Sequence, residues 1–406
     1  MNKTVITIPT YWTWDSERPA GPAEAIFDHP TPVDGESTLP RLLNSLCQIV
    51  GSSFTVWVLT ATVHSALQRA AEQRVAEIVA PFRERFPIAQ FTVSDLAALR
   101  ERMRERITNI RLRRGEFAPL FSLRSYPGVR NCQLAISHAM GAEVIIALDD
   151  DEIVDPDYVE RARHFVGRVV EGVNCADERV LGLAGLYLDA GGNTLLPESL
   201  PTGNIFLDKS AIMNEGAWAL QRAPGRLVDT PIAFGGNMLF HRDLFTCVGF
   251  DPSITRGEDI DYLINARLVG HRFWLDKKLF ITHLPPGTHN TPPYAKLAQD
   301  VCRFVYEREK LQLTGADPAQ FDPYPGRFLR DDVAPQALAA LEALATPEAV
   351  NRFGSPKEIV AIAERGAREA ALSYLEFAAR WPGLMEAIGQ DAELRERLLA
   401  RFDRPA

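Results

Sequence analysis

Residues 143–159 read EVIIALDDDEIVDPDYV, and this stretch decides the fold class. Residues 143–148 form an almost continuous apolar, β-branched run, which is typical of a strand buried on both faces of a parallel sheet. Three aspartates follow directly, at positions 149–151. Asp155 and Pro156 then suit the cap and the first position of a helix. The stretch therefore predicts a buried strand that ends in three acids and leads into a helix over residues 155–170.

The residues before this stretch alternate between strand and helix patterns. Apolar β-branched runs predict strands, and leucines or alanines at helical spacing predict helices. The first strand is expected to stop at Pro9. The expected strands cover residues 3–8, 54–59 and 89–93, and the expected helices cover residues 38–50, 65–85 and 131–140. Residues 96–114 are a charged, arginine-rich segment that is either helical or mobile. This alternation predicts an α/β fold with a parallel sheet that helices cover on both faces.

The residues after the acidic run continue the pattern and then change to helices. A strand is expected over residues 180–188, a helix over 258–269 and two short strands around Phe273 and Ile281, whereas residues 191–225 have the composition of a long irregular loop. LPPGTHNTPPY, which contains His289, has the composition of a flexible loop. From residue 294 onward the pattern is helical. We therefore divide the chain into residues 1–290 and a helical extension, 291–406.

The composition excludes several classes of protein. The chain has 406 residues and a net charge of -9, which gives no general attraction for nucleic acid. The start, MNKTVITIPTYW, has no signal-peptide form, and no later segment has the length of uncharged apolar residues that a spanning helix needs, so we expect a cytoplasmic protein. The five cysteines are scattered and contain no CxxC pair, so we expect buried free thiols.

The three aspartates are the strongest candidate site. Neighbouring carboxylates repel one another, and a hard divalent cation would supply the missing positive charge. Alternation along a strand end would send Asp149 and Asp151 to the same side. Open parallel sheets bind ligands beyond the carboxyl ends of their strands, where this cluster lies. The alternatives are a solvated acidic loop, and the acid-rich strand ends of phosphatases and nucleases.

Two longer blocks resemble GT-A glycosyltransferases, most closely glycosyltransferase family 2 and its relatives. The first is PGVRNCQLAISHAMGAEVIIALDDDEIVDPDYV, in which an Arg-Asn pair opens a helix that leads to a DxD strand. The second, AFGGNMLFHRDLFTCVGFDPSITRGEDIDYLINARLVGHRFWLDKKLFITHL, has a Gly-Gly-Asn stretch, a Glu-Asp pair and a closing His. The resemblance covers residues 3–290 and implies a mixed, mainly parallel GT-A sheet, with the C-terminal helices as an addition.

The resemblance implies a metal site under a donor diphosphate. Asp151 would bind Mn²⁺ or Mg²⁺ directly, and Asp149 would contact the ribose or reach the metal through water, with Asp150 beside them in the donor site. His283 matches the family's metal-binding histidine, and an imidazole ligand slightly favours manganese. A hydrogen-bonded histidine at a strand end is the alternative for His283.

Further residues are assigned to the donor. Arg130, directly before the helix expected at residue 131, would hold phosphate together with backbone donors of the helix start, or pair with the acidic cluster. Gly236 and Asn237 would let the backbone approach a sugar and bond its hydroxyls, unless they form a plain turn. Pro9 and Tyr11 lie at the carboxyl end of the first strand, on the ligand side of the sheet.

The Glu-Asp pair is the candidate for catalysis. The resemblance assigns the general base to Asp259, with Glu258 as the alternative; a helix-start acid without catalytic role is the other interpretation. The implied reaction moves a sugar from a nucleotide-diphosphate sugar to a hydroxyl acceptor, with inversion. A retaining transferase of the mannosylglycerate or glucosyl-phosphoglycerate synthase kind, and a non-catalytic sugar-nucleotide-binding protein, are the rival hypotheses.

Two properties stay open at this stage. Family 2 enzymes usually carry an aspartate at the end of the second strand, where this chain has the sequence VLTAT at residues 58–62, so the nucleotide base is not determined. The C-terminal helices leave a homo-oligomer open.

Overall fold

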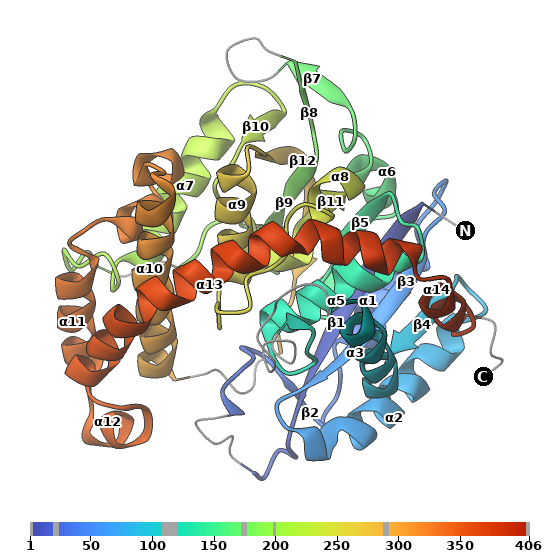
Figure 1. The fold of residues 1–406 in the computed structure, drawn as a ribbon, viewed down its shortest axis with the longest axis horizontal. Coiled ribbons are helices and arrows are strands. Elements are labelled where there is room, and N and C mark those ends of the chain that lie inside the picture. The colour runs from blue at the N-terminus through green and yellow to red at the C-terminus, as the bar shows by residue number, and fades with distance from the viewer. Residues whose placement is uncertain are drawn as a thin grey trace.

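The computed structural model describes residues 3–18, 24–107, 120–171, 177–197, 200–286 and 292–402. Within these residues a ten-stranded sheet forms the centre (Figure 1), in the order β10-β12-β9-β11-β5-β1-β3-β4, with β2 beside β1 and β6 beside β12. The strands are β1 (Thr4–Thr13), β2 (Thr31–Pro32), β3 (Thr55–Thr62), β4 (Ile88–Phe91), β5 (Val144–Ala147), β6 (Glu152–Ile153), β9 (Gly182–Leu188), β10 (Leu227–Asp229), β11 (Met238–His241) and β12 (Phe273–His283).

The sheet is mixed and mainly parallel. Strands β5, β1, β3 and β4 are parallel neighbours, and β9 pairs in parallel with β12. Strand β11 runs antiparallel to both β5 and β9, and so joins the two parallel parts. The α/β class that the sequence predicts, a mixed and mainly parallel sheet with a C-terminal helical region, is confirmed.

Alternate residues of the strands enter two different hydrophobic cores. In β1, Val5 belongs to the core under α3, α5 and α9, whereas Ile6 belongs to the core under α1, α2 and α6. Side chains of successive strand residues point to opposite faces, so an apolar run is buried on both. These helices are α1 (Leu39–Leu46), α2 (Gln68–Val79), α3 (Val93–Ile107), α5 (Tyr126–Ala139), α6 (Tyr158–Ala162) and α9 (Glu258–Leu268).

The first strand does not stop at Pro9, as the sequence suggested. Strand β1 continues to Thr13, and Pro9 pairs in register with Leu59 of β3. Thr7 accepts a hydrogen bond from the N–H of Leu148 on the β5 side, and backbone groups alternate sides along a strand, so Pro9 also faces that side. The pairing of β1 with β5 ends at Thr7. The missing N–H of Pro9 therefore removes no bond between strands.

Helix α5 begins five residues earlier than expected. Ser125 is at its N-cap and Pro127 lies in its first turn, where a proline removes no intrahelical hydrogen bond. Arg130 consequently lies inside the helix and not before it. The expected position of Arg130 before the helix is wrong, and a contact between Arg130 and a phosphate stays a prediction.

The second half of the chain departs from three expectations. The helix expected over residues 155–170 ends at Ala162, because residues 169–171 (β7) pair with residues 177–179 (β8) in a separate two-stranded sheet. The segment 191–225 contains helix α7 (Lys209–Arg222), which sequence reasoning missed because few of its residues are buried and apolar. The two strands expected around Phe273 and Ile281 are one strand, β12, with a register irregularity at its charged middle.

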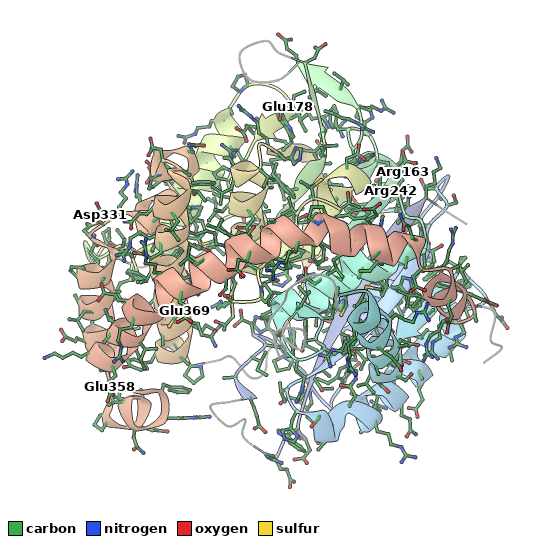
Figure 2. All side chains as sticks on the ribbon, viewed as in Figure 1. Arg163, Glu178, Arg242, Asp331, Glu358 and Glu369 are labelled. Carbon is green, nitrogen blue, oxygen red and sulfur yellow. The ribbon has the colours of Figure 1, made fainter. Side chains whose placement is uncertain are left out.

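The C-terminal helices pack on the rest of the chain. Helix α13 crosses from α10 and α11 to α5 and α14 (Figure 1), and its buried Trp381 lies in the same core as β1 and α5. Charged side chains such as Asp331, Glu358 and Glu369 lie on the outside of these helices (Figure 2). The elements not yet given are α8 (Arg242–Phe245), α10 (Pro293–Thr314), α11 (Val333–Leu344), α12 (Pro347–Phe353), α13 (Pro356–Gln390) and α14 (Ala392–Leu399).

The cysteines are less buried than expected. Cys132 is buried, Cys47 is half-buried, Cys247 and Cys302 are exposed, and Cys175 lies outside the described residues. Cys302 is exposed because it lies on the outer face of the amphipathic helix α10, between the buried residues Val301 and Arg303. None of the helices in the described ranges combines the length and the apolar composition that a bilayer crossing requires.

Candidate active site

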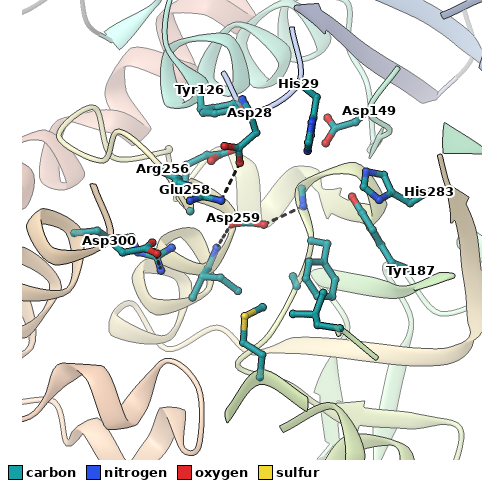
Figure 3. Close-up of a pocket in the computed structure, with 18 of the residues that line it drawn as sticks. Asp28, His29, Tyr126, Asp149, Tyr187, Arg256, Glu258, Asp259, His283 and Asp300 are labelled. Atoms are coloured by element: carbon teal, nitrogen blue, oxygen red, sulfur yellow. Dashed lines mark hydrogen bonds and ion pairs between the residues drawn. The ribbon is translucent and has the colours of Figure 1, made fainter. Parts of the chain in front are cut away.

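A cavity of about 360 Å³ lies beyond the carboxyl ends of β1 and β5, and both resemblance blocks contribute to its walls. Figure 3 shows Asp259 between two groups of lining residues, with Asp149 and His283 on one side and Arg256 and Asp300 on the other. Of the predicted site residues, the cavity is lined by Tyr11, Arg130, Asp149, Asp150, Asp151, Glu258, Asp259 and His283. Pro9, Gly236 and Asn237 are buried and are not among the lining residues.

The three aspartates lie in a turn, because β5 ends at Ala147. All three therefore line the cavity, and not only the alternate pair that strand geometry suggested. Asp149 accepts a hydrogen bond from Arg130 at 2.9 Å, whereas Asp151 lies 3.3 Å from Nε2 of His283. Oδ2 of Asp150 is buried and has no hydrogen-bond partner among the described residues.

The electrostatics of this acidic turn show a deficit of positive charge. Burial raises the pKa of Asp149 in spite of Arg130, and burial together with the charge of Asp151 raises the pKa of Asp150 well above its usual value. Burial alone would lower the pKa of His283, but the hydrogen bond and charge of Asp151 outweigh it and raise that pKa. The turn would therefore be stabilised by an added cation.

The described residues do not assemble the three predicted metal ligands into one cluster. No group of three or more His, Cys, Asp or Glu side chains in the described ranges has an arrangement that could hold a metal ion. Asp149 forms an ion pair with Arg130, so only two of the predicted ligands lie together. These are Asp151 of the acidic turn and His283 of β12. One carboxylate and one imidazole fit a divalent cation that takes its remaining ligands from water and a diphosphate.

Arg130 joins the two resemblance blocks. Its guanidinium is 3% exposed and binds Asp149 of the first block and, at 3.2 Å through Nε, Glu258 of the second. Its Nη1 has no hydrogen-bond partner among the described residues. The pairing with the acidic cluster that the sequence suggested is present, and the pairing with Glu258, across 128 residues of sequence, is one that it did not indicate.

The carboxylates of Glu258 and Asp259 have different surroundings. Asp259 accepts hydrogen bonds from the backbone N–H groups of Gly235 at 3.1 Å and Ile260 at 2.8 Å, and forms no ion pair with a described residue. Burial, followed by the charge of Asp259, raises the pKa of Glu258 to about 7, and burial raises that of Asp259. Asp259 is thus held in place by neutral donors while its carboxylate stays able to take a proton.

Position 257, directly before the Glu-Asp pair, requires a glycine. It has a φ of +74° as the N-cap of α9, and a Cβ atom there would lie 1.4 Å from Nη1 of Arg303. Only glycine combines this left-handed conformation with so close an approach. The guanidinium of Arg303, from α10, therefore lies directly behind the Glu-Asp pair.

Gly236 packs against Glu152, directly after the acidic turn, and Asn237 is bonded to residues outside the turn. The amide of Asn237 is occupied, since its Nδ2 donates to the carbonyl of Leu186 at 3.0 Å and its Oδ1 accepts from the hydroxyl of Tyr158 at 2.8 Å. A Cβ atom at Gly236 would lie 1.8 Å from Oε1 of Glu152, whose Oε2 accepts from the N–H of Asp149. The donor contacts expected of Gly236 and Asn237 stay predictions, and the observed contacts are structural.

Several lining residues were not found from the sequence. They come from the loop before β2, from α5, β9 and α7, from the residues before α9, and from α10 and the segment after it, and are Asp28, His29, Tyr126, Tyr187, Lys209, Arg256, Asp300, Arg303 and Tyr324. The signal in α10 was a charged residue every three or four positions on an otherwise apolar face, at 300, 303 and 307. His289, in the segment whose composition predicts a flexible loop, lies outside the described residues.

Comparisons with known proteins give distant similarities. No protein-family model matches the sequence, and no curated protein matches it. A mannosyltransferase from Pyrobaculum calidifontis, in complex with GDP-Man and Mn²⁺, is 16% identical, with 97% of this chain and 87% of that chain covered and a TM-score of 0.40. S. aureus TarS 1–349 is 12% identical, with 99% and 91% covered and a TM-score of 0.40. GalNAc-T7 with UDP, GalNAc and Mn²⁺ is 10% identical, with 86% and 56% covered and a TM-score of 0.38.

Proposed function

We propose that this protein is a metal-assisted glycosyltransferase that moves a sugar from a nucleotide-diphosphate sugar to a hydroxyl acceptor. One observation carries the proposal: a single cavity is lined by an acidic turn with His283 and by Asp259, a carboxylate that forms no ion pair with a described residue. A donor diphosphate needs positive charge and an acceptor hydroxyl needs a base. The cavity has groups for both needs.

The donor diphosphate is assigned to the acidic turn. Asp151 and His283 would hold a divalent cation, which neutralises the charge that develops on the departing diphosphate. Arg130 fixes the direction of Asp149, and its unpartnered Nη1 is a donor for a ligand oxygen. The hydroxyl of Tyr11 is also buried without a partner among the described residues, so it too is open to the donor.

Asp259 is assigned as the general base. As the acceptor oxygen bonds to the anomeric carbon, its proton passes to the Asp259 carboxylate, and the bond from that carbon to the diphosphate breaks with its electron pair on the diphosphate. Glu258 is tied to Arg130 and shares the site as a positioning residue. A base on the face opposite the leaving group gives inversion.

A donor screen with the full chain tests the proposal. UDP-, GDP- and ADP-sugars are incubated with Mn²⁺ or Mg²⁺, and released nucleoside diphosphate is measured with and without chelator. We expect one nucleotide series to be hydrolysed slowly in a metal-dependent way, because water replaces a missing acceptor. Absence of metal-dependent binding of every nucleotide sugar would refute the proposal, and a product with retained configuration would favour the retaining alternative. The cytoplasmic location and a homo-oligomer stay predictions from the sequence.

A further inference from the structure

A group of cations gathers around two carboxylates that line the cavity, Asp28 and Asp300. We call Lys209, Arg256, Lys296 and Arg303 the basic cluster; the first, second and fourth line the cavity. They come from α7, from the residue before Gly257, and from α10. Figure 3 shows Arg256 in this region, across Asp259 from Asp149 and His283.

The basic cluster has fewer carboxylates than cations. Asp300 binds Lys209 and lies 3.3 Å from Arg303, while Asp28 lies 2.9 Å from Arg256 and 3.7 Å from Lys296. Two carboxylates thus form the ion pairs of all four cations, apart from the longer contact of Arg303 with Glu307 at 3.9 Å, within the ranges that the structure describes.

The nearby carboxyl groups do not remove this imbalance. Burial raises the pKa of Glu307, the remaining carboxyl beside Arg303, to about 8, so this group is mostly uncharged at neutral pH. Asp259 accepts hydrogen bonds from backbone N–H groups and pairs with none of the four cations. As the proposed base, it takes up the proton of the acceptor hydroxyl. The cluster therefore has an excess of positive charge in a partly closed space.

Three side chains of the basic cluster are in a position to contact a ligand in the cavity. Lys209 and Arg256 line the cavity and are 25% and 21% exposed, whereas Arg303 also lines it but is only 3% exposed. Burial lowers the pKa of Lys209 although Asp300 opposes the shift, so its ammonium group is not fully compensated. An additional anion would compensate it.

We propose that the basic cluster is an acceptor subsite for an anionic group, so that the acceptor is a hydroxyl compound that also carries a carboxylate, phosphate or sulfate. This assignment of the acceptor class rests on the proposed function. Lys209 and Arg256 hold the anion, which sets the hydroxyl of the same molecule beside Asp259. The donor and the acceptor then carry their negative charges at opposite ends of the cavity, and each end has its own cations.

Binding of inorganic phosphate tests the subsite without any catalysis. The full chain is freed of metal, so that the acidic turn does not hold phosphate through a cation, and phosphate affinity is measured by titration calorimetry at constant ionic strength. Losing charge-assisted hydrogen bonds weakens binding by about 10-fold or more. We expect this loss in Lys209→Met with Arg256→Met, and no change in Lys278→Met, an exposed lysine that does not line the cavity.

A second variant should strengthen phosphate binding, whereas the double variant weakens it. Asp28→Asn removes a carboxylate that shares Arg256 and Lys296, so phosphate affinity should rise several-fold. A purely structural cluster would not bind phosphate more tightly in this variant. The subsite is refuted if the wild-type chain binds no phosphate, or if the double variant binds it as tightly as wild type and Asp28→Asn does not strengthen it.

Failure of the subsite can be separated from failure of the proposed function. Nucleotide-sugar binding with Mn²⁺ is measured on the same preparations. Retained nucleotide binding without phosphate binding refutes only the anionic acceptor. Phosphate binding at the basic cluster without any nucleotide binding refutes the glycosyltransferase and leaves an anion site on a different kind of protein. Acceptor trials then compare glucose with glucose 6-phosphate and glucuronate.

Discussion

At the scale of single residues, Asp259 and Glu258 differ in the kind of partner that holds them. Backbone N–H groups hold Asp259, and a guanidinium holds Glu258. Asp259→Asn keeps the size of the side chain and removes its basicity, so turnover should fall by about 10² to 10⁴ with donor affinity nearly unchanged. Steady-state kinetics and nucleotide titration measure the two effects. A variant within a few-fold of wild type would exclude Asp259 as the base.

The same pair determines the expected pH dependence. Burial raises the pKa of both carboxyls, to about 7 for Glu258, and a base must be deprotonated to act. Turnover should therefore rise as the pH increases through about 7, and the rising limb belongs to the pair. A pH–rate profile under saturating donor checks this expectation. A flat profile between about pH 5 and pH 8 would contradict it.

Asp151 and His283 are the residues on which metal affinity should depend. Both line the cavity and neither supports a core, so Asp151→Ala and His283→Ala should each weaken Mn²⁺-dependent nucleotide binding by at least about 10-fold while the thermal midpoint changes little. Asp155→Ala is a matched control, since Asp155 belongs to the same segment, is exposed and does not line the cavity. Unchanged metal affinity in His283→Ala would make it a strand-end residue only.

At the scale of elements, the acidic turn depends on its packing against the segment before β11. Because a Cβ atom at Gly236 would lie 1.8 Å from Glu152, Gly236→Ala should destabilise the protein by about 1 to 3 kcal/mol and displace the backbone of Asp149. Gly366→Ala is the control, because nothing lies within 4 Å of a Cβ atom there and α13 gains helix propensity. Urea unfolding should show opposite signs for the two variants.

At the scale of the whole molecule, the two parts of the chain share a core. Trp381 of α13 is fully buried, and its Nε1 donates to the carbonyl of Phe245 at 2.9 Å. Trp381→Ala should lower the free energy of unfolding by about 3 to 5 kcal/mol. Trp218→Ala, at a tryptophan that is 42% exposed, should change it by less than about 1 kcal/mol. If denaturant unfolding showed that Trp381→Ala lowers the free energy of unfolding no more than Trp218→Ala does, α13 would pack independently of the sheet.

The sequence by itself determined the features that depend on neighbours along the chain. The apolar run before Asp149 predicts a buried strand because each residue of it must meet a core, and a strand end in an open sheet predicts a ligand site. The Glu-Asp pair at the start of α9 follows from local helix signals in the same way. These properties are local, so periodicity was sufficient to place Asp151 at a strand end and Glu258 and Asp259 at a helix start. The resemblance added His283 to the same predicted site, and all four residues line the cavity.

Only the tertiary structure decided which distant groups meet. Arg130 joins Asp149 and Glu258 across 128 residues of sequence, and Arg303 reaches the cavity from a helix that the sequence assigned to an extension. No periodicity encodes such pairings, because they depend on how helices pack over a sheet. The same reason explains why Pro9 was misread as a strand end: whether a missing N–H matters depends on where the neighbouring strand stops, which is a property of the sheet and not of the strand.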